Sequence, residues 1–447
     1  MIPMAGLSIV LLASALGWAP HHVIVELEPD AAALVAAPLA LAGGVALEPL
    51  LPQGSALSST HLGRVFILVL DPSVDPAAAA AVLAAVEGVV RAGVDPRGRG
   101  ADVIPDDGDF PDQWSLHNDA DTDVNAPQAW ERSTGGGVLV AVVDTGVDAS
   151  HPQLAGLVDP GWDFANDDDD PADDHGHGTA ISSVIAARGN DGTGMAGVCW
   201  GCRILAVKVL DENNEGFYSH WVQGIDLAVT SGASVINLSL GGDMHSPELE
   251  TAVTAARDAG VVVIAAMMND GDGTPYYPAA YEAVIAVGAT DRRGRRADLM
   301  SIAGWASSYG DHIDLCAPGL ELVASSLTGG TEYWSGTSIA VPLVAGGAAL
   351  ALTVHPSAEP EQIREALRVT ATDGEGLPSE DVPGWDPYHG AGRLDLDRLT
   401  AVAAEGFADG DDDGVPAGMD CDDADPEVGE QCPEDPGPGS CGCAMVW

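Results

Sequence analysis

Short runs of apolar residues alternate with longer helical stretches between about residues 113 and 400. The runs are apolar at consecutive positions, as a strand must be when both of its faces are covered. Strand–helix alternation of this kind predicts an α/β fold with a doubly wound, mostly parallel sheet flanked by helices. In such sheets, ligand sites form at the carboxyl ends of the strands. The runs are Val138–Asp144, Ile204–Leu210, Val235–Leu240, Val261–Met267 and Val284–Thr290.

One helix start is marked by its own residues, in the stretch SPELE. Ser246 is suited to cap the helix, Pro247 to fill its first position, and Glu248 to lie in its first turn. The helix is expected to begin at Pro247.

Residues 20–105 follow a different pattern. They contain two strand-like runs, HHVIVELEP and RVFILVLDP, and then DPAAAAAVLAAVEGVV, an Ala-rich run that favours a helix. The segment DPRGRGADVIPDDGDFPD comes next and is rich in Gly, Pro and Asp. The pattern predicts a small α+β unit, followed by an exposed linker of the kind that proteases cut.

The first 19 residues are typical of a secretory signal peptide. An apolar run from Ala5 to Leu16 is too short to span a membrane comfortably, and small residues that fit signal cleavage follow it. The terminal amine is the only positive charge before the run, which departs from the usual signal. No later segment is expected to cross a membrane, so the chain is expected to be secreted or to lie at the cell surface.

Acidic residues dominate the charge, with 68 Asp and Glu against 17 Lys and Arg and a net charge of -51. Such a surface repels nucleic acids and anionic lipids, so no nucleic-acid partner is expected. It suits cation binding, or simply keeps a protein in solution. Residues 401–447 form an acidic tail with too few apolar residues to pack a core of its own.

Seven cysteines are spread over the body and the tail. The CWGC stretch, with Cys199 and Cys202, is expected to be a local structural pair or two buried thiols. It lacks the second CxxC of a zinc site and the βαβ context of a redox site. The spacing does not determine how the tail cysteines pair.

Three polar clusters stand at the ends of predicted elements. Asp144 ends a strand in VAVVDTGVD, His175 or His177 opens a helix in DDHGHGTA, and Ser338 opens a long apolar helix in WSGTSIAVPL. Each could be an ordinary turn or cap residue. Together they supply a nucleophilic serine, a histidine to take its proton and a carboxylate to hold the histidine. A serine at a helix N-terminus also lies where a developing oxyanion is favoured.

The stretches VAVVDTGVDASHPQL, GHGTA and SGTSIAVPLVAG resemble the three active-site signatures of the subtilisin-like serine proteases, in that family's order. VINLSLGG, YYPAAYEAVIAVGAT and LCAPG extend the resemblance over about residues 112–400, which fixes the expected peptidase domain at 106–400. The resemblance implies a serine endopeptidase that hydrolyses protein or peptide substrates through Asp144, His177 and Ser338 and an acyl-enzyme intermediate. The family's catalytic histidine precedes Gly-Thr, which selects His177.

Asn269, in the stretch MMNDG, ends the fourth apolar run. Its residue type fits a turn, or a donor aimed into a cleft. The resemblance implies that its amide stabilises the oxyanion together with the backbone N–H of Ser338. Met268 then stands where many relatives have a small residue in the wall of the pocket for the substrate residue before the cut. It would narrow that pocket unless it turns into the core.

The resemblance also implies how substrate binds along the cleft. The residues expected to bind the substrate backbone as an added strand are Ser239, Leu240 and Gly241.

Calcium is the expected cofactor, in a structural role. The acidic loop DFANDDDDPADDHGHG resembles a calcium-binding loop of some thermostable family members, and its candidate oxygen ligands are Asp163, Asn166, Asp168 and Asp170. A further family site is matched by Gln113 and Asn190, but Gln153 stands where an aspartate is expected. In the tail, the first half of an EF-hand loop is matched, without its closing glutamate, by Asp409, Asp411 and Asp413.

The unit at residues 20–105 resembles the family's inhibitory propeptide in its place and its outline of strands and helix. This implies a zymogen that is inhibited by its own propeptide and frees itself by cutting in the linker. The alternative hypothesis is a non-catalytic, calcium-binding surface protein that keeps the subtilisin-like fold. The intact Asp144, His177, Ser338 and Asn269 argue against it.

Overall fold

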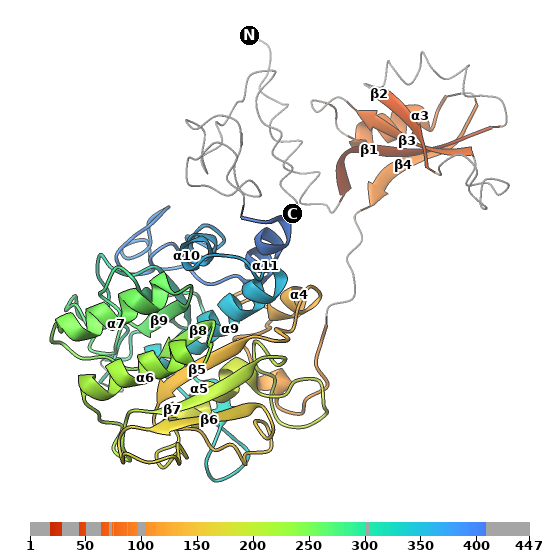
Figure 1. Ribbon diagram of the computed structural model, residues 1–447. Helices are drawn as coiled ribbons and strands as arrows, with labels where there is room; N and C mark the ends of the chain where they lie inside the picture. The colour runs from red at the N-terminus through yellow and green to blue at the C-terminus, as the bar shows by residue number, and fades with distance from the viewer. Residues whose placement is uncertain are drawn as a thin grey trace. The chain divides into compact units, whose positions relative to one another are not determined.

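The computed structural model describes residues 18–28, 44–50, 64–70, 74, 76–86, 88–96, 103–300 and 304–407. Its contacts divide the chain into two compact units, Met1–Ala101 and Asp102–Trp447 (Figure 1). Each unit has hydrophobic clusters of its own.

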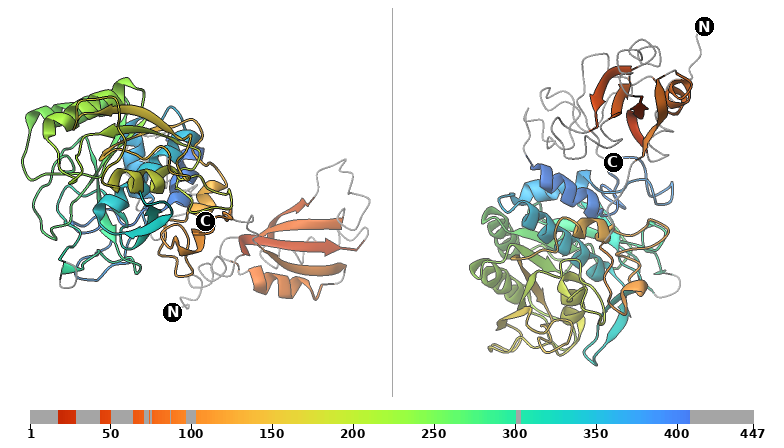
Figure 2. Two further views of the ribbon diagram at one scale, coloured as in Figure 1. Left: turned by 90° about the horizontal axis from the view of Figure 1, so that it is seen from below. Right: turned by 90° about the vertical axis from the view of Figure 1, so that its right-hand side faces the viewer.

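The smaller unit is a four-stranded antiparallel sheet with one helix against it (Figure 2). The strand order is β2–β3–β1–β4, so the first strand lies inside the sheet. Ala79, Ala80 and Leu83 of the helix pack with Val23 and Val25 of β1. The elements are β1 (Trp18–Leu27), β2 (Gly44–Pro49), β3 (Val65–Leu70), α3 (Pro76–Leu83) and β4 (Val89–Pro96). β1 therefore begins inside the predicted signal segment.

The larger unit is built on a seven-stranded sheet in the order β11–β10–β9–β8–β5–β7–β6, and all its neighbouring strands are parallel. This confirms the predicted α/β fold. β5 lies between β7 and β8, so the chain winds outward in both directions from it, and a crevice forms at the carboxyl ends of these strands. The strands are β5 (Leu139–Asp144), β6 (Val158–Asp163), β7 (Arg203–Lys208), β8 (Val235–Leu238), β9 (Val262–Ala266), β10 (Ile285–Thr290) and β11 (Leu315–Pro318).

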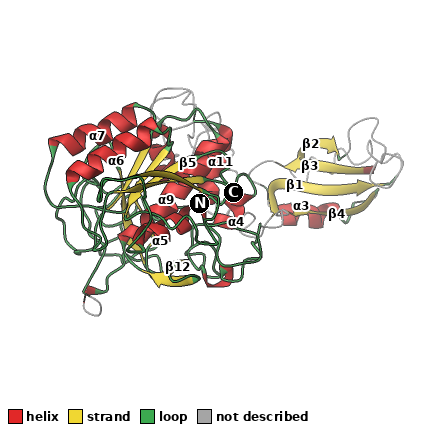
Figure 3. Ribbon diagram, turned by 60° about the horizontal axis from the view of Figure 1, so that its bottom comes forward, coloured by secondary structure: helices red, strands yellow, loops and turns green. Residues whose placement is uncertain are grey.

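Helices cover both faces of this sheet. Val140 and Val142 of β5 pack in the cluster that contains α5 and α9, whereas Ala141 and Val143 pack in the cluster that contains α6 and α7. Figure 3 shows α6 and α7 together on one side of the strands. Successive side chains of a strand point to opposite faces, which explains the consecutive apolar positions. The helices are α5 (His177–Ala186), α6 (Tyr218–Thr230), α7 (Pro247–Asp258) and α9 (Thr337–Val354).

Helix α9 is the long core helix of the larger unit. By length and composition it is the one described helix that could cross a membrane, a feature that the sequence analysis missed, but 83% of it is buried inside the unit. Two further helices contact it, α10 (Pro360–Val369) and α11 (Leu396–Glu405), and α4 (Ala126–Trp130) packs against α11. A two-stranded hairpin, β12 (Leu322–Ser325) with β13 (Thr331–Trp334), leads into the N-terminus of α9.

The predicted start of α7 is confirmed. The helix begins at Pro247, and the Ser246 hydroxyl accepts a hydrogen bond from the Leu249 N–H at 3.3 Å. The polar cap satisfies a backbone donor that the first turn cannot.

The predicted exposed linker is wrong in its second half. Asp107 is only 3% exposed and accepts hydrogen bonds from the backbone N–H groups of Asn190 and Asp191. Phe110, in a short 3-10 helix (Phe110–Asp112), is buried in the core. The aspartates that suggested solvent exposure instead satisfy the backbone of the loop that starts at Asn190, and one aromatic ring anchors the segment.

Cys199 and Cys202 form a disulfide in the larger unit. Both are fully buried, and Gly135 packs directly against their sulfur atoms. This confirms a local structural pair. Cys316 is a free, buried cysteine.

Candidate active site

The end of β5 meets the start of α5. Asp144, the last residue of β5, is fully buried, and its Oδ1 lies 2.7 Å from Nδ1 of His177, the first residue of α5. Gly178 makes this approach possible, because a Cβ on it would lie 2.1 Å from the Gly146 carbonyl oxygen. His175 is exposed, and its ring Nδ1 accepts a hydrogen bond from the His177 backbone N–H. Of the two histidines, His177 is therefore the one held against the carboxylate.

The surroundings favour a positive charge on His177. Burial by itself lowers the pKa of its imidazole, but the charge and hydrogen bond of Asp144, with the charge of Asp173, outweigh burial and raise that pKa above 6.5. Asp144 Oδ2 is buried and has no hydrogen-bond partner among the described residues. A buried carboxylate with an unsatisfied oxygen is stabilised when its neighbour becomes an imidazolium.

Ser338 is the second residue of α9, so its backbone N–H is one of the unpaired donors of that helix N-terminus. Its carbonyl oxygen accepts a hydrogen bond from Ser239 Oγ at 2.8 Å, and that hydroxyl in turn accepts one from Asn237 Nδ2 at 2.9 Å. The end of β8 and the start of α9 are thus tied together by buried polar contacts.

Two contacts place the start of α9 beside both His177 and Asn269. The ring of Trp334, four residues before Ser338, meets the His177 ring edge to face, with centroids 5.8 Å apart. Asn269 Oδ1 accepts hydrogen bonds from the backbone N–H of Thr337 at 2.8 Å and from its hydroxyl at 3.2 Å. This fixes the amide of Asn269 by its oxygen and leaves its N–H groups for another acceptor.

The two methionines before Asn269 lie differently. Met267 is fully buried and belongs to the core between the sheet, α6 and α7. Met268 adopts a left-handed backbone with φ 72°, which is uncommon for a residue with a side chain. Its Sδ would lie 2.8 Å from a Cβ placed on Gly241, so its side chain packs across the Gly241 backbone.

The chain after β8 presents a free backbone edge. Ser239, Leu240 and Gly241 make no backbone-to-backbone hydrogen bond to any residue that the structure describes. Gly242 then pairs with Tyr277 through two backbone hydrogen bonds of 2.9 and 2.8 Å. An unpaired edge of this length accepts an added strand.

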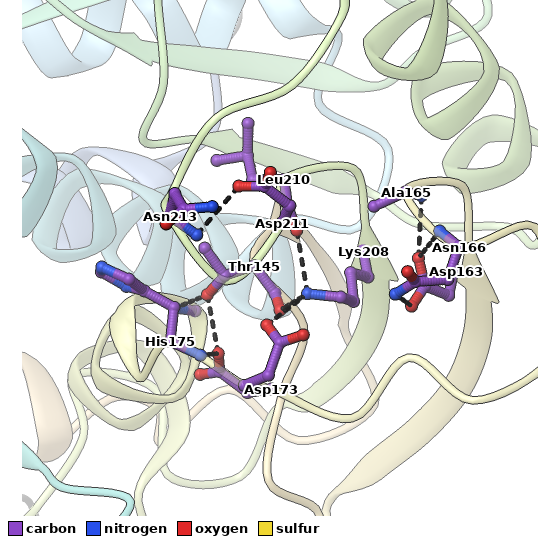
Figure 4. A network of polar contacts seen from close by, with 12 residues as sticks. Thr145, Asp163, Ala165, Asn166, Asp173, His175, Lys208, Leu210, Asp211 and Asn213 are labelled. Carbon is purple, nitrogen blue, oxygen red and sulfur yellow. Dashed lines mark hydrogen bonds and ion pairs between the residues drawn. The ribbon is translucent and has the colours of Figure 1, made fainter.

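A polar network behind Asp144 was not found from the sequence (Figure 4). Asp173 accepts hydrogen bonds from the hydroxyls of Thr145 and Thr179 and from backbone N–H groups at the start of α5. Lys208, the last residue of β7, is 1% exposed, and its ammonium donates to the Thr145 carbonyl, the Leu210 carbonyl and Asp174. A lysine at the end of an apolar strand was the available signal, because lysine is almost never fully buried unless it is paired.

The acidic loop offers oxygen donors that are only partly gathered. Asp163 is buried and accepts N–H bonds from Ala165 and Asn166, whereas Asn166, Asp168 and Asp170 are exposed. Among the described residues, no three acidic or histidine side chains of this loop bring ligand atoms within 4.8 Å of one another. Oxygen donors fit calcium, and backbone carbonyls also serve it, so calcium at this loop stays a prediction.

At the other position where the family resemblance suggested calcium, two glutamine side chains form hydrogen bonds with the backbone of the loop at residues 190–196. Gln113 exchanges two hydrogen bonds of 2.8 Å with the backbone of Ala196. Gln153 donates to the Thr193 carbonyl and accepts from the Met195 N–H. The tail candidates Asp409, Asp411 and Asp413 lie outside the described residues.

Fold and site together define a class: parallel α/β proteins that gather an aspartate, a histidine and a helix-opening serine at the carboxyl edge of the sheet. The sequence pattern of the subtilase family, peptidase family S8, matches residues 135–392. The chain belongs to the subtilase family of serine proteases.

Relatives are similar over more than half of the chain. A thermophilic serine proteinase of Bacillus sp. (strain AK1) is 43% identical over 60% of this chain and 62% of its own length. Thermitase of Thermoactinomyces vulgaris is 40% identical over 61% of this chain and 91% of its own length. A solved protease from Pseudoalteromonas arctica PAMC 21717 superposes with a TM-score of 0.60 and 31% identity, over 67% of this chain and 99% of that one.

Proposed function

We propose that the chain is a serine endopeptidase in which Ser338 is the nucleophile, His177 the general base and Asp144 the residue that orients His177. The observation that carries the proposal is the 2.7 Å contact of His177 with buried Asp144 beside the serine-bearing end of α9. His177 takes the Ser338 proton as Oγ attacks the scissile carbonyl, and then gives it to the leaving amine. Water then attacks the acyl-enzyme in the same way, with His177 again taking and returning the proton, and Ser338 is released.

Charge on the carbonyl oxygen is proposed to be held by two donors. One is the Ser338 backbone N–H at the positive end of α9, and the other is the Asn269 side-chain amide, whose oxygen is already held by Thr337. Both donors are in place before reaction, so no reorganisation is needed as the oxyanion forms.

Substrate is proposed to bind along Ser239, Leu240 and Gly241 as an added strand, since their backbone groups are unpaired. Met268 is partly buried against the core and packs over Gly241, and it is proposed to reduce the pocket for the side chain before the cut. The substrates favoured by this site are therefore peptides with a small residue at that position.

The smaller unit is proposed to be an inhibitory propeptide, preceded by a signal peptide, in a secreted zymogen. Support comes from its separate core and its position before the peptidase unit. Asp107 and Phe110 anchor the segment that follows it, so the maturation cut is expected between Pro96 and Val103. Calcium is proposed to stabilise the acidic loop that contains Asp163 and Asp168, with no part in peptide hydrolysis.

The test compares the wild-type chain with Ser338→Ala, and with Ser357→Ala as a control at an exposed serine of the same unit. Wild type and control are expected to cleave themselves between residues 96 and 103, as read by mass spectrometry, and to react with a fluorophosphonate probe. Ser338→Ala should stay full-length and unlabelled. A folded wild type that does neither would favour the non-catalytic surface-protein alternative.

A further inference from the structure

A second group of ligand-type side chains lies in the connection between α10 and α11, apart from the proposed active site. One oxygen of Asp381, one oxygen of Asp386 and one ring nitrogen of His389 all lie within 4.8 Å of one another. Asp386 is 3% exposed and His389 4% exposed, whereas Asp381 is half-buried. The connection is joined to the edge strand β11, because Trp385 Nε1 donates to the Ile313 carbonyl and Arg393 pairs with Cys316.

Hydrogen bonding leaves two of these ligand atoms unused. Nδ1 of His389 lies 3.2 Å from the Glu380 carbonyl, which can only accept, so Nδ1 donates this hydrogen bond and Nε2 is the ring nitrogen left for another partner. His389 Nε2 and Asp381 Oδ1 are both buried, and neither has a hydrogen-bond partner among the residues that the structure describes. Asp381 Oδ2 accepts from the Gly376 N–H. A buried ring nitrogen and a buried carboxylate oxygen that both lack a partner fit a shared cation.

Among the described residues, the basic group nearest to these carboxylates is the His389 ring itself, whose Nδ1 lies 3.8 Å from Asp386 Oδ1. In the described part of the chain, neither Asp381 nor Asp386 has a lysine or arginine nitrogen within 4.0 Å. The nearby guanidinium of Arg296 is committed to Glu380 at 2.9 Å. Asp386 instead accepts three backbone N–H bonds, from Val382, Tyr388 and His389.

The backbone of Gly376 lies directly against the group. A Cβ on Gly376 would lie 2.6 Å from Asp381 Oδ2 and 2.8 Å from His389 Cε1. The glycine backbone therefore approaches both candidate ligands more closely than any other residue could.

We propose that Asp381, Asp386 and His389 bind a divalent transition-metal ion of the zinc class, with water in the remaining coordination positions. Two carboxylates and one imidazole form a ligand set that zinc accepts, whereas calcium and magnesium take oxygen ligands. The Nδ1–H bond to a backbone carbonyl is the outer contact that orients a metal-binding histidine. The metal would cross-link the α10–α11 connection at the place where it lies beside β11. This role would be structural and would not depend on peptidase activity.

The experiment titrates Zn²⁺ into the full-length Ser338→Ala chain by calorimetry, with Ca²⁺ in excess and the accessible thiols alkylated. His389→Gln and Asp381→Asn each remove one ligand, and Asp373→Asn is a control at an exposed aspartate of the same connection. We expect one zinc site, weakened at least about tenfold by either ligand variant and unchanged in the control. Co²⁺ in the same site should give a visible spectrum without sulfur charge transfer.

Equal zinc affinity in the parent and in both ligand variants would overturn the proposal, as would the absence of zinc binding in the parent. If His389→Gln does not fold, as judged by circular dichroism in chelator, Asp381→Asn decides the result. Binding is read without catalysis, so failure here leaves the proposed peptidase function intact.

Discussion

At the residue scale, the proposed chemistry depends on how a few side chains are held. Asp144 and Asp173 place negative charge near His177. The backbone N–H of Thr337 donates to the amide oxygen of Asn269, and the Met268 side chain packs on the Gly241 backbone. Each of these contacts predicts one functional property that can be measured.

The first such property is the pH dependence of activity. His177 acts as a base only when neutral, and its pKa is raised above 6.5 by Asp144 and Asp173, against the effect of burial. The rate should therefore fall as the pH drops through a value above 6.5, as read from kcat/KM against pH. Imidazole NMR of Ser338→Ala should give the same midpoint for His177. A midpoint below 6.5 in both measurements would contradict the assigned electrostatics.

The second property is the oxyanion contact. Asn269→Ala removes one of two proposed donors, and loss of one such donor in subtilisin lowers kcat by about 10²–10³-fold. The same loss is expected here, with KM little changed, since the contact forms chiefly in the transition state. A rise in KM at constant kcat would instead assign Asn269 to ground-state binding.

The third property is pocket preference. Met268→Gly should broaden cleavage in a peptide library toward large side chains before the cut, because the thioether that covers Gly241 is gone and glycine accepts φ 72°. Met267→Leu is the control, since that side chain is fully buried in the core. Identical cleavage profiles for wild type and Met268→Gly would mean that Met268 does not border the pocket.

At the element scale, the site exists because β5, α5 and α9 meet at one edge of the sheet. α5 must lie almost in contact with the loop after β5 for His177 to reach Asp144. Gly178 sets that distance, with room for no side chain between it and the Gly146 carbonyl.

Gly178→Ala should therefore separate the two elements. A Cβ there would lie 2.1 Å from a backbone oxygen and 3.3 Å from Asp144 Cβ, so α5 must shift. We expect a lower melting temperature and a loss of activity of at least about 10²-fold, because a displacement of roughly 1 Å is enough for that loss. Gly136→Ala is the control, since no atom lies within 4 Å of its added Cβ. Equal activity of the two variants would show that the contact is not needed.

At the scale of the whole molecule, the chain has a net charge of -51, and the acidic loop of the larger unit is exposed, so we expect bound cations to stabilise the protein. A bound cation reduces the repulsion between neighbouring exposed carboxylates. Because the cation binds the folded state, it raises the free energy of unfolding.

EGTA should lower the melting temperature of full-length Ser338→Ala, and added Ca²⁺ should restore it more fully than Zn²⁺ or Mg²⁺. Asp168→Asn, which removes one exposed loop carboxylate, should show a smaller calcium-dependent shift. The measurement is calorimetric unfolding with each ion separately. An EGTA effect that only Zn²⁺ reverses would assign the stabilising metal to Asp381, Asp386 and His389 instead of to the loop.

The sequence by itself determined the parallel α/β fold, five of the seven strands of its sheet, the Ser246 cap and the positions of Asp144, His177, Ser338 and Asn269 at the ends of elements. It did not predict β6 and β11. The features that it determined follow from local periodicity, capping chemistry and motif spacing, which act over a few neighbouring residues.

Tertiary structure decided what depends on contacts between distant segments. The ring of Trp334 contacts that of His177, and the buried ammonium of Lys208 donates to backbone carbonyls. Asp107 accepts a backbone hydrogen bond from Asn190 and so anchors part of the segment that was expected to be a linker. Met267 and Met268 are adjacent and both follow the end of β9, yet they pack differently: Met267 is fully buried in the core cluster with α6 and α7, whereas Met268 is partly buried against the other cluster and packs across Gly241. The direction of a side chain beyond the end of a strand, and contacts between distant segments, leave no repeating pattern of apolar and polar residues in the sequence. Only the packing of the folded chain determines them.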